Sequence, residues 1–193
     1  MVLPIVAYGD PVLKKRGQNI DSEYPGLKQL IADMFETMEN APGVGLAAPQ
    51  IGRSIRMFVV DASPFAEDME TEEEVEMMKN FRKVFINPEI LEEDGKEWAF
   101  EEGCLSIPSV REDVSRKSDI RMRYFDENFE EHEETFSGIP ARIIQHEYDH
   151  VEGVLFTDHL NPLRRRLLKK RLGDVSKGNI EVGYKMRFPA KKR

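Results

Sequence analysis

The sequence has a single cysteine, Cys104, among 193 residues, so it can form no internal disulfide. It also lacks any apolar run near the roughly 18 residues that a membrane span requires. Residues 1–7 contain no basic cluster and are interrupted by Pro4, which is not the pattern of a signal peptide. A lone thiol fits a reducing compartment. We therefore expect a cytoplasmic protein that does not associate with a membrane.

Basic residues are scarce in most of the chain and concentrated at its end. Residues 164–193 carry twelve basic and two acidic residues, whereas the first 163 residues carry 16 basic and 34 acidic ones. An acidic body repels nucleic acid as a whole, so we expect no sequence-specific DNA binding. The basic end can still touch phosphate, but a solvated face that balances the acidic body explains it equally well.

Length and composition favour one domain. We expect residues 1–172, with an acidic insertion at about 64–80, to form its main part. Residues 173–193 would be a basic C-terminal extension of the same domain. Seven of the ten residues 67–76 are acidic, which is typical of a solvated insertion or a short exposed helix.

Strand patterns outnumber helical ones, which predicts an α+β fold. Apolar residues at helical spacing predict a helix over Leu27–Asn40, and residues 44–49 are expected to form an extended, glycine-rich loop. Further helices are expected over 141–152 and, with basic character, over 161–172. The expected strands are 55–60, 83–87 ending at Pro88, 96–100, 118–125 and, after a turn at 126–128, 129–136.

The most informative motif is HEYDH at residues 146–150, inside the helix predicted over 141–152. Residues four apart share a helix face, so His146 and His150 can reach one cation. Glu147 lies near enough to bond a water molecule at that cation. The competing interpretation is a surface helix with two solvated histidines, which the helix start and stop signals disfavour.

A catalytic metal site usually has a third protein ligand. One metallopeptidase pattern places a third histidine where this sequence has Phe156, which excludes that class. Another pattern uses a downstream glutamate, but only Glu152, which is too close, and Glu181, in the basic tail, follow the motif. The remaining soft ligand is Cys104. Because a lone cysteine is more often a small buried side chain, both interpretations of it stay open here.

Three motifs together resemble those of peptide deformylases. They are GVGLAAPQ at residues 43–50, EGCLS at 102–106 and HEYDH at 146–150. They stand in the family's order and at similar separations, so the resemblance covers about residues 1–172. It implies a single α+β domain with antiparallel or mixed sheets around a central helix that carries HEYDH. It also implies a hydrolase that removes the formyl group from the N-terminal formylmethionine of newly made polypeptides.

The resemblance assigns roles to individual residues. It implies one divalent metal with water in the fourth position and three protein ligands, Cys104, His146 and His150. Iron(II) is the implied native metal, and nickel, cobalt or zinc can occupy the site. Metal-bound hydroxide would attack the formyl carbon and release formate, with Glu147 as general base and then acid. The Gln50 side chain and the Leu105 backbone N–H would stabilise the developing negative charge.

The resemblance also implies how an N-formylmethionyl nascent peptide would bind. Val44, Gly45 and Gly103 would contact the substrate backbone, as when an extended peptide adds a strand to a sheet. The methionine side chain would enter an apolar pocket whose wall we assign by position to Val44, Ile139, the stem of Arg142, and Ile143. These are also ordinary core positions.

Two other hypotheses remain. The first is a general zinc endopeptidase, which shares the histidine helix and the base but lacks a suitable third ligand in this sequence. The second is a ribosome- or RNA-associated module that uses the basic helix at 161–172 and has a vestigial metal site. Contact of the basic helix with ribosomes is also compatible with a deformylase, because formylated chains emerge from ribosomes.

Overall fold

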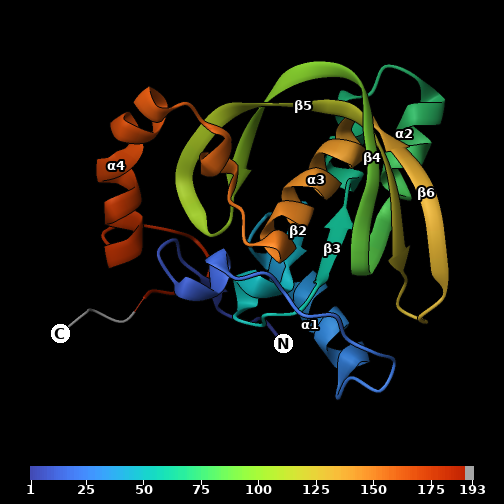
Figure 1. The fold of residues 1–193 in the computed structure, drawn as a ribbon, viewed down its shortest axis with the longest axis horizontal. Helices are drawn as coiled ribbons and strands as arrows, with labels where there is room; N and C mark the ends of the chain where they lie inside the picture. The colour runs from blue at the N-terminus through green and yellow to red at the C-terminus, as the bar shows by residue number, and fades with distance from the viewer. Residues whose placement is uncertain (190–193) are drawn as a thin grey trace.

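The structure is a computed structural model that describes residues 1–189. A five-stranded antiparallel sheet forms the body of the protein (Figure 1). The last four residues of the predicted basic extension, 190–193, lie outside the described residues. The strands follow the order β2-β3-β4-β5-β6, which leaves β2 at one edge. Their bounds are β2 Gly45–Ala47, β3 Met57–Asp61, β4 Arg82–Cys104, β5 Ile107–Phe125 and β6 Glu131–Ser137. The α+β prediction is confirmed.

Strands β4 and β5 form one long hairpin. The sequence predicts a strand over 83–87 that ends at Pro88 and a separate strand over 96–100, and this prediction is wrong because β4 continues through both segments. The pairing register between β4 and β5 shifts between Ile86 and Glu89. The irregularity takes Pro88, which has no N–H to donate, out of the regular ladder.

Two other boundaries differ from the prediction. The strand predicted over 118–125 is only the second half of β5. The turn predicted at 126–128 is present, because Asp126 Oδ1 accepts hydrogen bonds from the N–H groups of Asn128 and Glu130. Strand β6 therefore begins at Glu131, after this turn closes.

Residues 1–189 contain four α-helices, and the first has the predicted bounds. They are α1 Leu27–Asn40, α2 Glu72–Lys79, α3 Gly138–Glu152 and α4 Pro162–Lys177. Helix α4 extends beyond the predicted end at residue 172, and Gly178, at φ 76°, ends it. No helix in residues 1–189 is long and apolar enough to cross a membrane.

Helix α3 crosses the middle of the molecule beneath the arch of β4 and β5 (Figure 1). It packs against β2, β3, β5 and β6, and its residues Ala141, Ile143, Ile144 and Val151 belong to the largest core cluster. Gly153 ends the helix at φ 77°, where a Cβ atom would lie 2.9 Å from the Lys14 backbone. Glycine is therefore required at this end of the helix.

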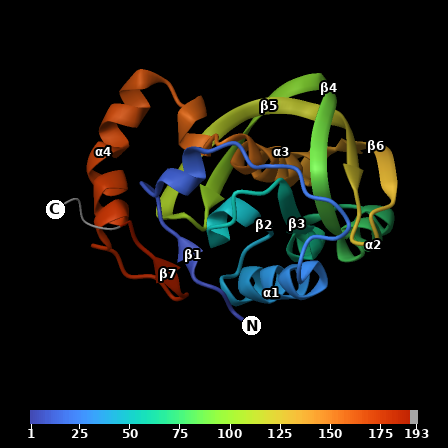
Figure 2. The same ribbon diagram turned by 60° about the horizontal axis from the view of Figure 1, so that its bottom comes forward.

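Two chain segments far apart in sequence meet in a second, small sheet. Strand β1 (Ile5–Val6) pairs in parallel with β7 (Met186–Arg187). In the view of Figure 2, this pair lies between α4 at one side of the molecule and α1. The C-terminal extension thus returns to the body of the fold.

The acidic insertion folds as a short 3-10 turn at Ser63–Asp68 followed by α2. Thr71 and Glu74 form a capping box at the start of α2, and three glutamates in its first turn suit the positive end of the helix dipole. The glutamates are exposed, whereas Met78 is 3% exposed and packs in the core. The interpretation as a short exposed helix is confirmed.

The apolar stripe of α1 gives a stability prediction. Met34 is fully buried in a second core cluster, in which side chains of α1 pack against β2 and β3, among them Leu46 and Val59. We therefore expect Met34→Ala to lower the free energy of unfolding by about 2–4 kcal/mol. Lys28→Ala, on the exposed face of the same helix, should change it by less than about 0.5 kcal/mol. Denaturant unfolding measures both values, and equal losses would contradict the packing described here.

Candidate active site

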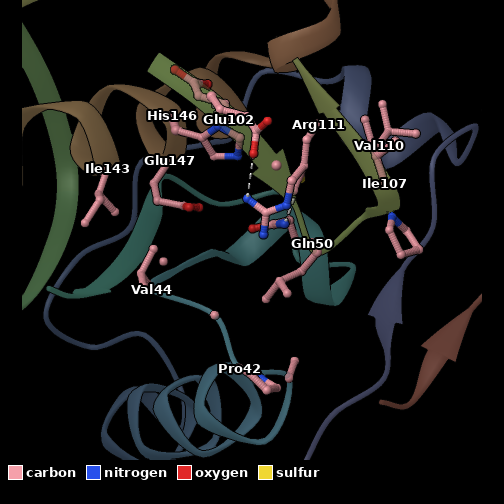
Figure 3. Close-up of a pocket in the computed structure, with 18 of the residues that line it drawn as sticks. Pro42, Val44, Gln50, Glu102, Ile107, Val110, Arg111, Ile143, His146 and Glu147 are labelled. Atoms are coloured by element: carbon pink, nitrogen blue, oxygen red, sulfur yellow. Dashed lines mark hydrogen bonds and ion pairs between the residues drawn. The ribbon is translucent and has the colours of Figure 1, made fainter. Parts of the chain in front are cut away.

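A cavity of about 540 Å³ lies where α3, the β2 region and the β4–β5 turn meet. Figure 3 shows His146 and Glu147 extending into it from α3, opposite Val44. Its wall includes two residues from segments for which the sequence suggested no role, Phe65 of the acidic insertion and Tyr184 of the C-terminal extension. The cavity therefore draws residues from most of the chain.

Three potential metal ligands converge beside this cavity. One ligand atom from each of Cys104, His146 and His150 lies within 4.8 Å of the others. The Cys104 Sγ atom is 3.3 Å from His150 Nε2. The two histidines are 9% and 1% exposed. The helix supplies the two imidazoles one turn apart, and the end of β4 supplies the thiol.

A buried carboxylate orients one of these imidazoles. Glu102 Oε2 lies 2.9 Å from His146 Nδ1. Burial alone would raise the pKa of Glu102, but hydrogen bonds from His146 and Arg116 hold it well below its usual range. An ionised carboxylate only accepts, so Nδ1 carries a proton and Nε2 is the atom left for a ligand bond once the ring is neutral.

Two arginines neutralise Glu102. Arg116 donates from Nε and Nη2 to its two oxygens, at 2.7 and 3.0 Å, and Arg142 Nη1 donates to Oε1 at 3.0 Å. Arg116 also bonds Asp149 Oδ2 at 2.8 Å, and Asp149 in turn bonds His159. None of these partners is one of the three potential metal ligands. They hold Glu102 in place, and Glu102 in turn holds His146.

Sequence reasoning missed Glu102 and Arg116 as part of the site. Both had a signal. Glu102 lies two residues before Cys104 and so falls on the same strand face. Arg116 interrupts the alternation of buried apolar residues along β5, between Val114 and Ile120. A charged residue at an inward position is rarely buried without a partner.

Glu147 has the surroundings of a proton acceptor. A Cβ atom built on Gly45 would lie 2.7 Å from Glu147 Cγ and Cδ, so the carboxylate packs directly against that glycine. Its Oε2 atom is buried and has no hydrogen-bond partner among the described residues. Burial raises the pKa of Glu147 to about 7. A group with such a pKa can both take and return a proton near neutral pH.

Gln50 is locked with its amide nitrogen toward the ligand group. Its Oε1 accepts the Ala47 N–H at 2.9 Å, which directs Nε2 to Cys104 Sγ at 3.5 Å and Ser106 Oγ at 3.3 Å. The residues predicted as a loop over 44–49 form strand β2 and the start of a 3-10 turn at Ala48–Ile51. This turn carries Gln50, which is 1% exposed.

Most residues predicted to bind substrate line the cavity. They are Val44, Gly45, Gly103, Arg142 and Ile143, together with Leu105. Ile139 is not on the cavity wall and packs against the largest core cluster instead. Arg142 is 2% exposed, and besides Glu102 it bonds the carbonyl oxygens of Val114 and Trp98.

The residues present fit a transition-metal ion. One thiolate and two imidazoles are ligands that zinc, iron and nickel accept, and hard cations such as magnesium disfavour thiolates. Burial alone would raise the pKa of Cys104, but His150 and His146 lower it to about 5, so the sulfur is a thiolate at neutral pH. A buried carboxylate next to such a ligand group is the arrangement of metal-dependent hydrolases, and the cavity assigns the chain to that class.

Comparison with known proteins narrows this class. Residues 2–166 match the polypeptide deformylase family. The peptide deformylases of Christiangramia forsetii and Cytophaga hutchinsonii are 61% and 56% identical to this chain, with 100% of it and 99% and 100% of theirs covered. The crystal structure of a peptide deformylase from Legionella pneumophila matches with a TM-score of 0.77 at 35% identity, over 93% of this chain and 98% of that one.

The chain therefore belongs to the polypeptide deformylase family. It is an enzyme, and the family's reaction is the deformylation of nascent peptides with the help of a metal.

The thiol environment gives a pH prediction. In metal-free protein, the ultraviolet absorbance of the Cys104 thiolate should appear as the pH rises through about 5 and be complete at neutral pH. His150→Gln removes one stabilising partner, so the midpoint should move up toward the ordinary value of about 8.5. A midpoint above pH 8 in the unsubstituted protein would contradict the charge arrangement described here.

Proposed function

We propose that this chain removes the formyl group from the N-terminal formylmethionine of newly made polypeptides by a metal-dependent hydrolysis in the cavity described above. The observation that carries the proposal is the buried, unpartnered Glu147 carboxylate beside the ligand group Cys104, His146 and His150. These three residues would hold one divalent metal, with iron(II) as the native ion and nickel, cobalt or zinc able to replace it. A cation bound there acts as a Lewis acid and lowers the pKa of water from about 15.7 toward neutrality.

Glu147 is the proposed general base and acid. Water adds to the formyl carbon as the carboxylate of Glu147 takes one of its protons. The same carboxyl group then gives that proton to the departing amine nitrogen, so formate and a free amino terminus are released. The close packing of Glu147 against Gly45 supports this role, because it holds the carboxylate next to the strand that would carry the substrate.

Gln50 and Leu105 are the proposed donors to the former formyl oxygen, which gains negative charge as water adds. Support for Gln50 comes from its fixed amide, whose nitrogen already lies 3.5 Å from Cys104 Sγ. Leu105 directly follows Cys104, so its N–H belongs to the same turn. One such donor is worth about 3–4 kcal/mol of barrier.

The substrate backbone is proposed to lie along β2. This strand is at the sheet edge, with β3 on one side only, and Gly45 within it lines the cavity. An extended peptide can add to such an edge, with further contacts from Val44 and Gly103. Val44, Ile143 and the stem of Arg142 would then enclose the methionine side chain.

Replacing the base tests the mechanism. Glu147→Gln keeps the shape of the side chain but cannot take a proton, so formate release from N-formyl-Met-Ala-Ser should fall by about 10²–10⁴-fold while bound metal stays at one per chain. Glu73→Gln, on the exposed face of α2, is the matched control and should be fully active.

Two results would count against the proposal. Full activity of the Glu147→Gln protein would remove the base from the reaction. Cleavage of the unformylated peptide Met-Ala-Ser, without formate release from the formylated one, would favour the general endopeptidase.

We also propose that α4 contacts ribosomes. Leu163 and Leu167 are 67% and 64% exposed on this helix, beside exposed basic residues. Arg164 is already paired with Glu112, so the contact would use Arg165, Arg166, Lys169 and Lys170. Basic groups next to exposed apolar ones suit a surface of RNA and protein.

Co-sedimentation with ribosomes tests this contact. The logarithm of the binding constant should fall linearly with the logarithm of salt concentration. Lys169→Glu/Lys170→Glu should make this slope shallower by about 0.7–0.9 for each phosphate group that the variant no longer neutralises. Deformylation of a free peptide should not change in this variant. Binding that is independent of salt would exclude an electrostatic contact.

A further inference from the structure

The C-terminal extension leads back to the cavity. After α4 the chain reverses at Gly178, and β7 then pairs with β1. The N–H groups of Ile5 and Ala7 donate to the carbonyl oxygens of Lys185 and Arg187, both at 2.9 Å. This segment lies beyond residues 2–166, the part of the chain that matches the family. The peptide deformylases of Christiangramia forsetii and Cytophaga hutchinsonii align with the whole chain, so the segment is shared with these relatives although the family match does not include it.

Tyr184 reaches the turn that follows Cys104. Its hydroxyl donates a hydrogen bond of 2.7 Å to the carbonyl oxygen of Leu105. Its ring is half-buried, packs against the second core cluster and forms part of the cavity wall. The strand pairing directly after it fixes the backbone from which the ring projects.

The same turn is held from other sides. The Tyr8 N–H, just after β1, donates to the Ser106 carbonyl oxygen at 2.8 Å. Gln50 Nε2 donates to Ser106 Oγ at 3.3 Å. The Leu105 side chain also packs so closely on Gly43 that a Cβ there would lie 2.7 Å from Leu105 Cδ1. The hydrogen bonds from Tyr8 and Gln50 are thus made to Ser106, whereas the one from Tyr184 is made to Leu105.

We propose that Tyr184 is a positioning residue for deformylation, holding Leu105 so that its backbone N–H faces the oxygen that gains charge. The inference rests on the proposed function, in which that N–H is a donor. The two peptide groups that flank Leu105 share its Cα atom. Fixing the carbonyl on one side therefore restricts the rotation of the N–H on the other. Donors for a developing charge are effective when they are oriented before the reaction.

Tyr184→Phe tests the proposal because it removes only the hydroxyl. We expect kcat for N-formyl-Met-Ala-Ser to fall about 5- to 10-fold in the metal-loaded enzyme, with KM changed less than about 2-fold, since a misplaced donor weakens the transition state more than the ground state. Affinity for the product Met-Ala-Ser should stay the same.

Tyr24→Phe is the matched control. Tyr24 packs against the same core cluster, and its hydroxyl has no hydrogen bond to any side chain or backbone group in residues 1–189. This variant should keep the kcat and the KM of the unsubstituted enzyme. Circular dichroism and thermal unfolding of both variants show whether the fold is retained.

The outcomes separate the two proposals. If the unsubstituted enzyme releases no formate, the proposed function fails. If it does and Tyr184→Phe keeps full kcat, only the role of Tyr184 is overturned. A lower melting temperature with unchanged kcat would make Tyr184 a structural anchor, which also overturns the proposal.

Discussion

The site depends on one buried carboxylate, Glu102. It joins the end of β4 to α3 through His146 Nδ1, and it does so inside the protein, where an unpaired charge would be strongly destabilising. Arg116 and Arg142 supply the compensating charge. Arg116 also forms an ion pair with Asp149, near the C-terminal end of α3. Removing one member of such a buried group costs far more than the group itself contributes to stability. The helix and the β4–β5 hairpin are thereby held in the one relative position that brings Cys104 to the histidines.

The local parts of this arrangement could be predicted from the sequence. His146 and His150 share a helix face because helices have 3.6 residues per turn, and α1 was predicted with its observed bounds for the same reason. The long hairpin could not be predicted, since the bulge that carries β4 past Pro88 depends on pairing with β5. The bonds from Arg116 to Glu102 and from Tyr184 to Leu105 join residues 14 and 79 positions apart, and no periodicity encodes such contacts.

The acidic insertion and the C-terminal extension, for which the sequence predicted no role in the site, both contribute a residue to the cavity wall. The acidic insertion contributes Phe65, whose ring centroid lies 6.4 Å from that of Phe100, another residue of the wall. The C-terminal extension contributes Tyr184 through the pairing of β7 with β1. Their exposed charged residues explain the unusual composition, whereas Phe65 and Tyr184 make the contacts with the cavity. Composition alone therefore hides their contribution, because it averages over both faces.

The proposed function depends above all on Cys104, His146 and His150 holding one transition-metal ion together. Cobalt(II) substitution tests this most directly, because a cobalt–thiolate bond produces a charge-transfer band in the near ultraviolet that imidazole ligands do not. We expect one cobalt per chain with this band, and loss of the band in Cys104→Ser while the protein stays folded. A band that persists in Cys104→Ser, or stoichiometric cobalt binding without any such band, would contradict the site described here.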